Sequence, residues 1–184
     1  MGIDKKLGLI FIHIPKTGGT SIEYAFNFYD DNNKGTGIKN GKAMQHFTWK
    51  EYEKFFSSLY RPLPYNNYFK FSIVRNPYDR LISEYYWCEV PGIGFKSNQS
   101  FDDFVNTVEN IVKNKNFKET IYHDHFIPQY HFIYKNDKLV VNKLFKFENF
   151  NQIIIFLKQK YKINNIPHAH LQKYDKINLN YYQK

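Results

Sequence analysis

Cysteine is nearly absent from this sequence, and long apolar runs are absent altogether. Cys88 is the one cysteine in 184 residues, which excludes a disulfide framework and zinc sites built on paired cysteines. No apolar run approaches the ~20 residues that a membrane-spanning helix needs. The apolar run near the N-terminus is too short for a secretory signal and continues directly into a motif. We therefore expect a cytoplasmic protein with no transmembrane segment.

Aromatic residues and positive charge are, by contrast, abundant. Aromatics make up 20% of the chain, and Lys and Arg outnumber Asp and Glu by 26 to 17, for a formal net charge of +9. So many aromatic side chains exclude a disordered chain, and the length predicts a single domain over residues 1–184. The positive charge leaves three classes of partner open: nucleic acid, a membrane surface, or an anionic substrate or cofactor.

A strand, a turn and a helix follow one another at least twice along the chain. The first unit has a buried strand at 7–14 and a helix at 22–28, and the second has a strand at 68–74 and a helix at 76–87. This pattern predicts an α/β fold of three α/β/α layers with a central parallel sheet. The other expected elements are helices at 48–59, 100–113 and 149–161, a strand at 138–147, and irregular chain at 114–134. Ligands of such sheets bind at the carboxyl ends of the strands, where both turns lie.

The turn after the first strand has the residue types of an anion-binding loop. It consists of Lys16, Thr17, Gly18, Gly19, Thr20 and Ser21. The glycines allow backbone N–H groups to point at an anion, the helix N-terminus adds partial positive charge, and the hydroxyls are further donors. The loop differs from a Walker A sequence, because Gly19 stands where that motif has its lysine. The sequence therefore predicts a site for a phosphate-like group without Mg²⁺.

The turn after the second strand carries a second anion-binding group. Arg75 ends the strand, where an ATPase or kinase would have a magnesium-binding Asp, and its planar guanidinium suits bidentate binding of a phosphate. Ser83 lies two turns into the following helix and can point its hydroxyl toward the same group. Arg80, on that helix too, is expected to form an ion pair with Asp79, Glu84 or a neighbouring element. Two anion sites at neighbouring strand ends predict a ligand with two separated phosphate-like groups.

At these two turns the sequence resembles the sulfotransferases that use PAPS (3′-phosphoadenosine-5′-phosphosulfate). The stretch 11–21 is similar to that family's 5′-phosphosulfate loop, and 73–83 is similar to its 3′-phosphate motif. Both are closest to the branch that contains heparan-sulfate 2-O-sulfotransferase and the related carbohydrate sulfotransferases, which 126–129 and 140–149 fit loosely. The resemblance implies a P-loop NTPase-like sulfotransferase fold. It also implies transfer of a sulfuryl group from PAPS to an acceptor hydroxyl, release of adenosine 3′,5′-bisphosphate (PAP), and no metal.

The resemblance further implies roles for individual residues. Lys16 would contact the oxygen that bridges phosphate and sulfate, and Arg75 and Ser83 would bind the 3′-phosphate. The 5′-phosphate would be held by Thr17, Gly18, Gly19, Thr20 and Ser21. His46 is the one histidine between the two motifs, the interval that holds the catalytic base in this branch. Lys173 lies in a C-terminal stretch that matches poorly and is a candidate for covering the nucleotide.

Three other classes of function stay open at this point. They are a P-loop nucleotide or nucleoside kinase, a nucleic-acid-binding module, and a non-catalytic binder of anionic glycans. The lysines are scattered rather than clustered, so no nucleic-acid partner is expected. The expected partner is a hydroxyl-bearing acceptor, a carbohydrate or a small molecule, and His125 or Gln129 are candidates for lining its cleft.

The histidines have alternative interpretations as well. His46 precedes a helix that is expected to begin after Thr48, so it could simply flank that helix. The histidines and the carboxylate at 123–125, together with His131, could be metal ligands. Hydrogen-bonded histidines are the better interpretation, because no further cysteine or carboxylate pattern completes a site. His13, at the end of the first strand, is expected to be structural.

Overall fold

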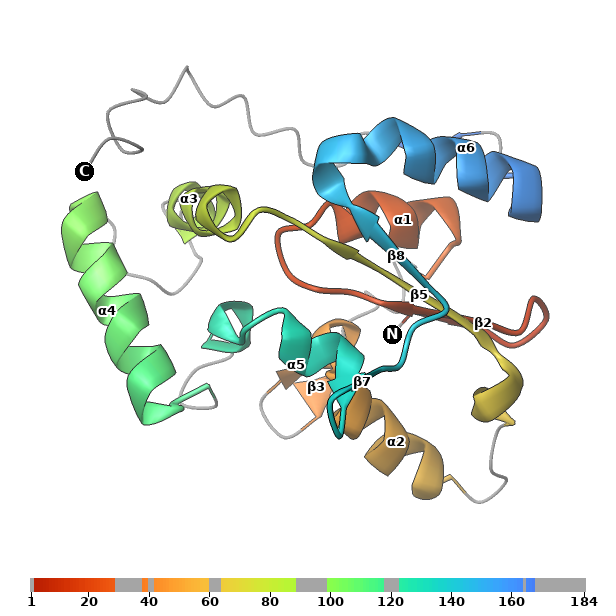
Figure 1. Cartoon of the computed structure of the whole chain (residues 1–184), viewed down its shortest axis with the longest axis horizontal. Helices are drawn as coiled ribbons and strands as arrows, with labels where there is room; N and C mark the ends of the chain where they lie inside the picture. Colours follow the sequence, from red (N-terminus) through yellow and green to blue (C-terminus); the bar gives the residue numbers. More distant parts are fainter. Residues whose placement is uncertain are drawn as a thin grey trace.

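The computed structural model describes residues 2–28, 38–39, 42–59, 64–88, 99–117, 123–163 and 165–167. Its centre is a four-stranded sheet in the order β1-β2-β5-β8 (Figure 1). The strands are β1 (Gly2–Asp4), β2 (Leu9–Ile12), β5 (Phe69–Val74) and β8 (Lys143–Lys146). Strands β2, β5 and β8 run parallel, which confirms the predicted sheet, and the antiparallel β1 is an addition at its edge.

The edge strand β1 turns back directly into β2. Asp4 Oδ1 accepts hydrogen bonds from the backbone N–H groups of Lys6 and Leu7, at 2.8 and 2.9 Å. Gly8 has a φ of 58°, a left-handed conformation that glycine adopts without steric cost. The sequence did not predict this hairpin, because a strand of three residues is too short to show an alternating pattern.

Helices cover both faces of the sheet. Helices α1 (Gly19–Ala25) and α6 (Phe150–Tyr161) lie on one face, and α2 (Trp49–Ser57) and α5 (Tyr130–Ile133) lie on the other (Figure 1). Along β2, Leu9 and Phe11 join the core under α1 and α6, whereas Ile10 and Ile12 join the core under α2 and α5. A strand that is apolar on both faces is typical of a parallel sheet between two helical layers. The three-layer α/β/α prediction is therefore confirmed.

A third, smaller apolar cluster lies beyond the end of β5. It joins α3 (Pro77–Cys88) and α4 (Phe101–Asn114) to the 3₁₀ turn η3 (His123–Phe126). Its buried side chains are Cys88, Phe104, Ile111 and Phe126. This packing holds η3 close to the helix that follows the second strand turn, which matters for the site described below.

The helix starts follow from local sequence. Thr48 and Glu51 form the predicted capping box at α2, and the Thr48 N–H donates to Glu51 Oε2 at 2.8 Å. Ser100 caps α4 by accepting a hydrogen bond from the Asp103 N–H at 3.1 Å. Pro77 occupies the first position of α3, where the missing N–H costs nothing.

Two stretches differ from the sequence prediction. The stretch 114–134, predicted to be irregular, contains η3 and α5. The strand predicted at 138–147 is divided into two short strands on either side of 140–142. The first of them belongs to a hairpin whose turn residues, Asn136 and Asp137, have φ of 48° and 58°. The hairpin pairs β6 (Tyr134–Lys135) with β7 (Lys138–Leu139), and only β8 joins the central sheet.

The remaining short elements are β3 (Ile38–Lys39), β4 (Lys42–Ala43), η1 (Met44–His46), η2 (Tyr65–Asn67) and η4 (Phe147–Asn149). Within the described ranges, no helix has both the length and the apolar character needed to cross a membrane.

Candidate functional site

The two strand turns meet at one edge of the sheet. Strands β2 and β5 are neighbours in register, with Ile12 opposite Ser72, so both chains leave the sheet at the same end. The Ser72 hydroxyl donates to the Ile12 carbonyl at 2.7 Å, and Arg75 Nη1 donates to the Lys16 carbonyl at 3.3 Å. The structure thus places the two sequence motifs side by side, as parallel pairing requires.

The first turn is held in an unusual backbone conformation. Lys16 has a φ of 64° and Gly18 a φ of 79°. A left-handed lysine costs free energy, and such residues concentrate at functional sites. A Cβ on Gly19 would lie 2.2 Å from the His13 ring, so this position admits only glycine. The Thr17 hydroxyl donates to the Ile14 carbonyl at 2.8 Å, so it holds the turn rather than pointing at a ligand.

Lys16 directs its side chain toward helix α3. The ammonium lies 5.1 Å from the centre of the Trp87 ring, a cation–π distance. Burial lowers the pKa of the Lys16 ammonium to about 8, against the opposing charge of Glu84. The side chain is half-buried, so it can still reach a bound anion. Of the other two polar residues of the first turn, Ser21 is buried and Thr20 is half-buried.

Arg75 is fixed through its backbone. Its N–H donates to Gln129 Oε1 at 3.0 Å, and Gln129 Nε2 donates to the Arg75 carbonyl at 2.8 Å. The Gln129 amide is thereby committed to Arg75, which argues against its expected place in an acceptor cleft. The guanidinium of Arg75 is half-buried and lies 4.5 Å above the Phe147 ring. Ser83 is buried in α3, and Lys173 lies outside the described residues.

Arg80 ties both turns to η3. Its Nε donates to the Pro15 carbonyl at 3.0 Å, and its two terminal nitrogens donate to the carbonyls of Ile127 and His125. The sequence predicted an ion pair for this residue, and the observed partners are backbone carbonyls instead. A planar fork with five donors can serve several acceptors at once, so Arg80 acts as a rigid connection between loops.

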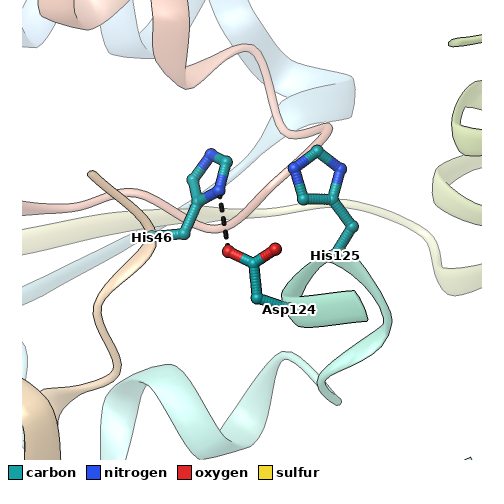
Figure 2. Close-up of side chains that lie close together, drawn as sticks. All are labelled: His46, Asp124 and His125. Atoms are coloured by element: carbon teal, nitrogen blue, oxygen red, sulfur yellow. Dashed lines mark hydrogen bonds and ion pairs between the residues drawn. The ribbon is translucent and has the colours of Figure 1, made fainter. Parts of the chain in front are cut away.

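His46 lies deep in the protein, at the end of η1. Its Nδ1–H donates to Asp124 Oδ2 at 3.1 Å (Figure 2). On the other side of the ring, Gln45 Nε2 donates to His46 Nε2 at 3.2 Å. This pair of contacts assigns the proton to Nδ1 and the lone pair to Nε2. Burial lowers the pKa of His46 to about 4; the Asp124 hydrogen bond opposes this shift and nearby histidines add to it. The ring is therefore neutral near pH 7.

Three histidines form a row between the end of β2 and α3. The rings of His13 and His46 lie 4.9 Å apart, and those of His46 and His125 lie 4.8 Å apart, both edge to face. The His125 ring stacks on Trp87 at 4.6 Å, which itself lies under the Lys16 ammonium. A continuous series of ring contacts therefore runs from His46, the expected base, to Lys16, the lysine expected to bind the leaving group.

Each histidine of the row is paired with a buried carboxylate. Besides His46 and Asp124, His13 Nδ1 lies 3.1 Å from a Glu23 oxygen, and the His125 Nδ1–H donates to Glu84 Oε1 at 2.8 Å. Burial alone would raise the pKa of Glu23 and of Glu84, but their histidine partners outweigh it and both pKa values are lowered. His13 thus contacts His46 and Glu23 and also packs against Gly19. It makes more contacts within the candidate site than the structural role expected from the sequence implied.

The sequence did not indicate that Glu23, Asp124 and Glu84 each pair with a histidine. Glu23 and Glu84 lie on predicted helices, where a carboxylate most often faces water, and nothing local distinguishes them. Asp124 and His125 were considered as metal ligands together with His131, which is exposed on α5. The structure instead brings His46 to Asp124 and His125, from a position 78 residues earlier in the chain than Asp124.

Comparison with known proteins gives the family. All of the chain, residues 1–184, matches a family model described as the sulfotransferase family. No curated protein and no solved structure matches the chain. The assignment therefore rests on the family model together with the arrangement of the two strand turns.

The contacts of Arg80 generate a stability prediction that does not depend on the reaction. Lysine keeps the charge but cannot reach three carbonyls, so Arg80→Lys should lower the free energy of unfolding by about 2 kcal/mol or more. Lys113→Ala, which removes an exposed ion pair with Glu109, should change it by less than about 1 kcal/mol. Urea unfolding measures both. An Arg80→Lys protein as stable as the Lys113→Ala protein would contradict the proposed connection.

Proposed function

Because this chain belongs to the sulfotransferase family, we propose that it transfers the sulfuryl group of PAPS to a hydroxyl of an acceptor. The observation that carries the proposal is the single sheet edge at which Lys16 and Arg75 meet beside the buried pair of His46 and Asp124. The two half-buried cations fit a donor with two separated anionic groups. PAPS supplies, when bound, an activated sulfuryl group on a phosphate leaving group.

The first turn is proposed to hold the 5′-phosphosulfate. Lys16 would bind the bridging oxygen, where its charge offsets the negative charge that develops on the leaving phosphate. Backbone N–H groups from Thr17 to Ser21 would bind the phosphate oxygens at the N-terminus of α1. The Thr17 hydroxyl is used within the turn, so its contribution would come from its backbone. Gly19 stands where a Walker sequence has its lysine, and a side chain there would displace the His13 ring, which disfavours the kinase alternative.

The second turn is proposed to bind the 3′-phosphate. Arg75 would present its guanidinium as a bidentate donor, and Gln129 would hold its backbone in place through two hydrogen bonds. Glu148 adds support, since its Oε1 accepts a 2.6 Å hydrogen bond from the Asn76 N–H. Ser83 is assigned to the same phosphate only on the strength of the resemblance, as is Lys173 to the nucleotide.

His46 is proposed to be the general base. Its Nε2 carries the lone pair, and Asp124 orients the ring by accepting the Nδ1 proton. An acceptor hydroxyl would take the place of the Gln45 amide at Nε2 and give up its proton there as it attacks the sulfur in line. A base held in this way is worth about 10²–10⁴-fold in rate.

The acceptor and the compartment are proposed from the sequence. A carbohydrate hydroxyl is proposed because the two turns are most similar to the heparan-sulfate 2-O-sulfotransferase branch. The other scattered lysines would attract an anionic acceptor through long-range attraction. A cytoplasmic location is proposed from the single cysteine, because enzymes of the secretory pathway commonly carry disulfides.

The donor assignment predicts selective binding of PAP. PAP without Mg²⁺ should raise the melting temperature of the wild-type protein more than adenosine 5′-monophosphate does, because only PAP carries a 3′-phosphate. Arg75→Ala should weaken PAP binding by about tenfold or more, the loss expected for a charge-assisted contact. The variant should then bind PAP and adenosine 5′-monophosphate with similar affinity. Thermal shift and calorimetry measure both.

Two outcomes would count against this donor. If Arg75→Ala still distinguishes PAP from the monophosphate by the wild-type factor, the second turn does not bind the 3′-phosphate. If only ATP with Mg²⁺ shifts the melting temperature, the protein is a kinase.

The base assignment predicts a pH profile. The kcat/KM for PAPS should be bell-shaped, because the free enzyme needs neutral His46 and charged Lys16. The acid limb should lie well below pH 6.5, toward the His46 pKa of about 4, and the basic limb near pH 8, the pKa of Lys16. His46→Ala should lower kcat by about 10²-fold or more while the Kd for PAP stays within a few-fold.

His131→Ala is the matched control, since it removes an exposed histidine and should leave both the profile and kcat unchanged. Retained PAP affinity shows that the His46→Ala protein is folded. A His46→Ala enzyme with wild-type kcat would remove the base assignment and leave the donor assignment intact.

A further inference from the structure

Three side chains of the histidine row form a compact set of possible metal ligands. One ligand atom from each of His46, Asp124 and His125 lies within 4.8 Å of the others (Figure 2). All three residues are at least nine-tenths buried. Among the described residues, these three form the group whose possible ligand atoms lie this close together. His46 belongs to η1, and Asp124 and His125 belong to η3. The three side chains therefore come together only in the folded chain.

The donor set is that of a borderline transition metal. Two imidazole nitrogens and one carboxylate oxygen are typical ligands of Zn²⁺, which binds three protein groups and leaves a fourth position open in many sites. Ligand bonds of about 2.0–2.2 Å place donor atoms roughly 3.3 Å apart in a tetrahedral site. The observed bound of 4.8 Å exceeds this spacing by about an ångström and a half at most.

The surroundings of His125 favour ligation. Its Nδ1–H donates to Glu84 Oε1 at 2.8 Å, which leaves Nε2 as the ligand atom. A carboxylate on the far nitrogen of a ligating histidine is the usual arrangement at zinc sites, where it fixes the tautomer and strengthens the ligand. Stacking on Trp87 further limits rotation of the ring.

The local charge also suits a divalent cation. Asp124 and Glu84 bring two buried negative charges to the group. The positive charges of Lys16 and Arg80 act on these carboxylates at a distance, while the direct contacts of both cations lie elsewhere. Arg80 donates to backbone carbonyls, and Lys16 lies over the Trp87 ring. The pair of His13 and Glu23 is a useful internal contrast, because it has the same ion-pair contact but belongs to no group of three ligands among the described residues.

We propose that His46, Asp124 and His125 bind one divalent transition-metal ion of the Zn²⁺ class. The proton on His46 Nδ1 leaves to solvent as that nitrogen and Asp124 turn from each other to the ion, while His125 ligates through Nε2. The site is defined by geometry alone. Its consequence rests on the proposed function: an ion held by His46 withdraws the base, so Zn²⁺ inhibits sulfuryl transfer.

Co²⁺ titration tests the site without PAPS or an acceptor. Protein stripped with a chelator should bind one Co²⁺ per chain, with the strong visible absorption of a tetrahedral ion, and Zn²⁺ should displace it. His125→Ala and Asp124→Asn should weaken binding by at least tenfold, and Glu84→Gln by about 10–100-fold. His131→Ala, at an exposed histidine, should bind Co²⁺ as the wild type does.

Circular dichroism and melting temperature establish which variants are folded, and Glu84→Gln keeps all three ligands if the other two fail to fold. Absence of tetrahedral Co²⁺ in the wild type overturns the proposal. So does equal binding by the wild type, Glu84→Gln and the ligand variants, which would indicate an adventitious surface ion only. Tetrahedral Co²⁺ binding by a protein that, once stripped of metal, transfers no sulfuryl group would leave the site standing and remove the proposed function. Transfer by the stripped protein, with no Co²⁺ bound on titration, would do the reverse.

Discussion

The parallel pairing of β2 with β5 is the constraint on which the rest of the structure depends. It sends the chain out of the sheet twice at the same end, so that Lys16 and Arg75 lie on adjoining turns. The buried Ser72 hydroxyl donates to the Ile12 carbonyl at 2.7 Å, a contact between the two strands that a one-residue slip would break. The adjoining position of the two turns is therefore a consequence of strand pairing, and Arg80 secures it by joining the first turn to η3.

A second layer of organisation is the row of buried histidines. Each ring contacts a buried carboxylate, so every buried carboxylate of the row has a histidine as its polar partner. The same burial lowers the pKa of His46 and of Lys16, which gives a neutral base and a lysine with a pKa not far above neutrality. Asp124 has two proposed roles: it orients His46 when no metal is bound, and it binds the ion together with His46 when one is present.

The parts that the sequence predicted are those with a local signal. Continuous apolar runs marked β2 and β5, and the capping pair of Thr48 and Glu51 marked α2. The parts it missed depend on contacts between distant segments. Asp124 meets His46 across 78 residues, and the carbonyls that bind Arg80 leave no trace in the side-chain pattern, so an ion pair was the natural expectation. The hairpin before β8 was missed because each of its strands has only two residues, which is too short to show an alternating pattern.

The most direct test of the central claim, that one sheet edge holds PAPS for transfer, is the fate of labelled sulfate. The protein is incubated with PAPS carrying labelled sulfur and a panel of carbohydrate and small hydroxyl acceptors, with a chelator in place of Mg²⁺. The account predicts labelled acceptor and an equal amount of PAP, with both lost in Lys16→Ala. Label transfer that is unchanged in Lys16→Ala, or no transfer to any acceptor by a protein that is folded and binds PAP, would contradict it.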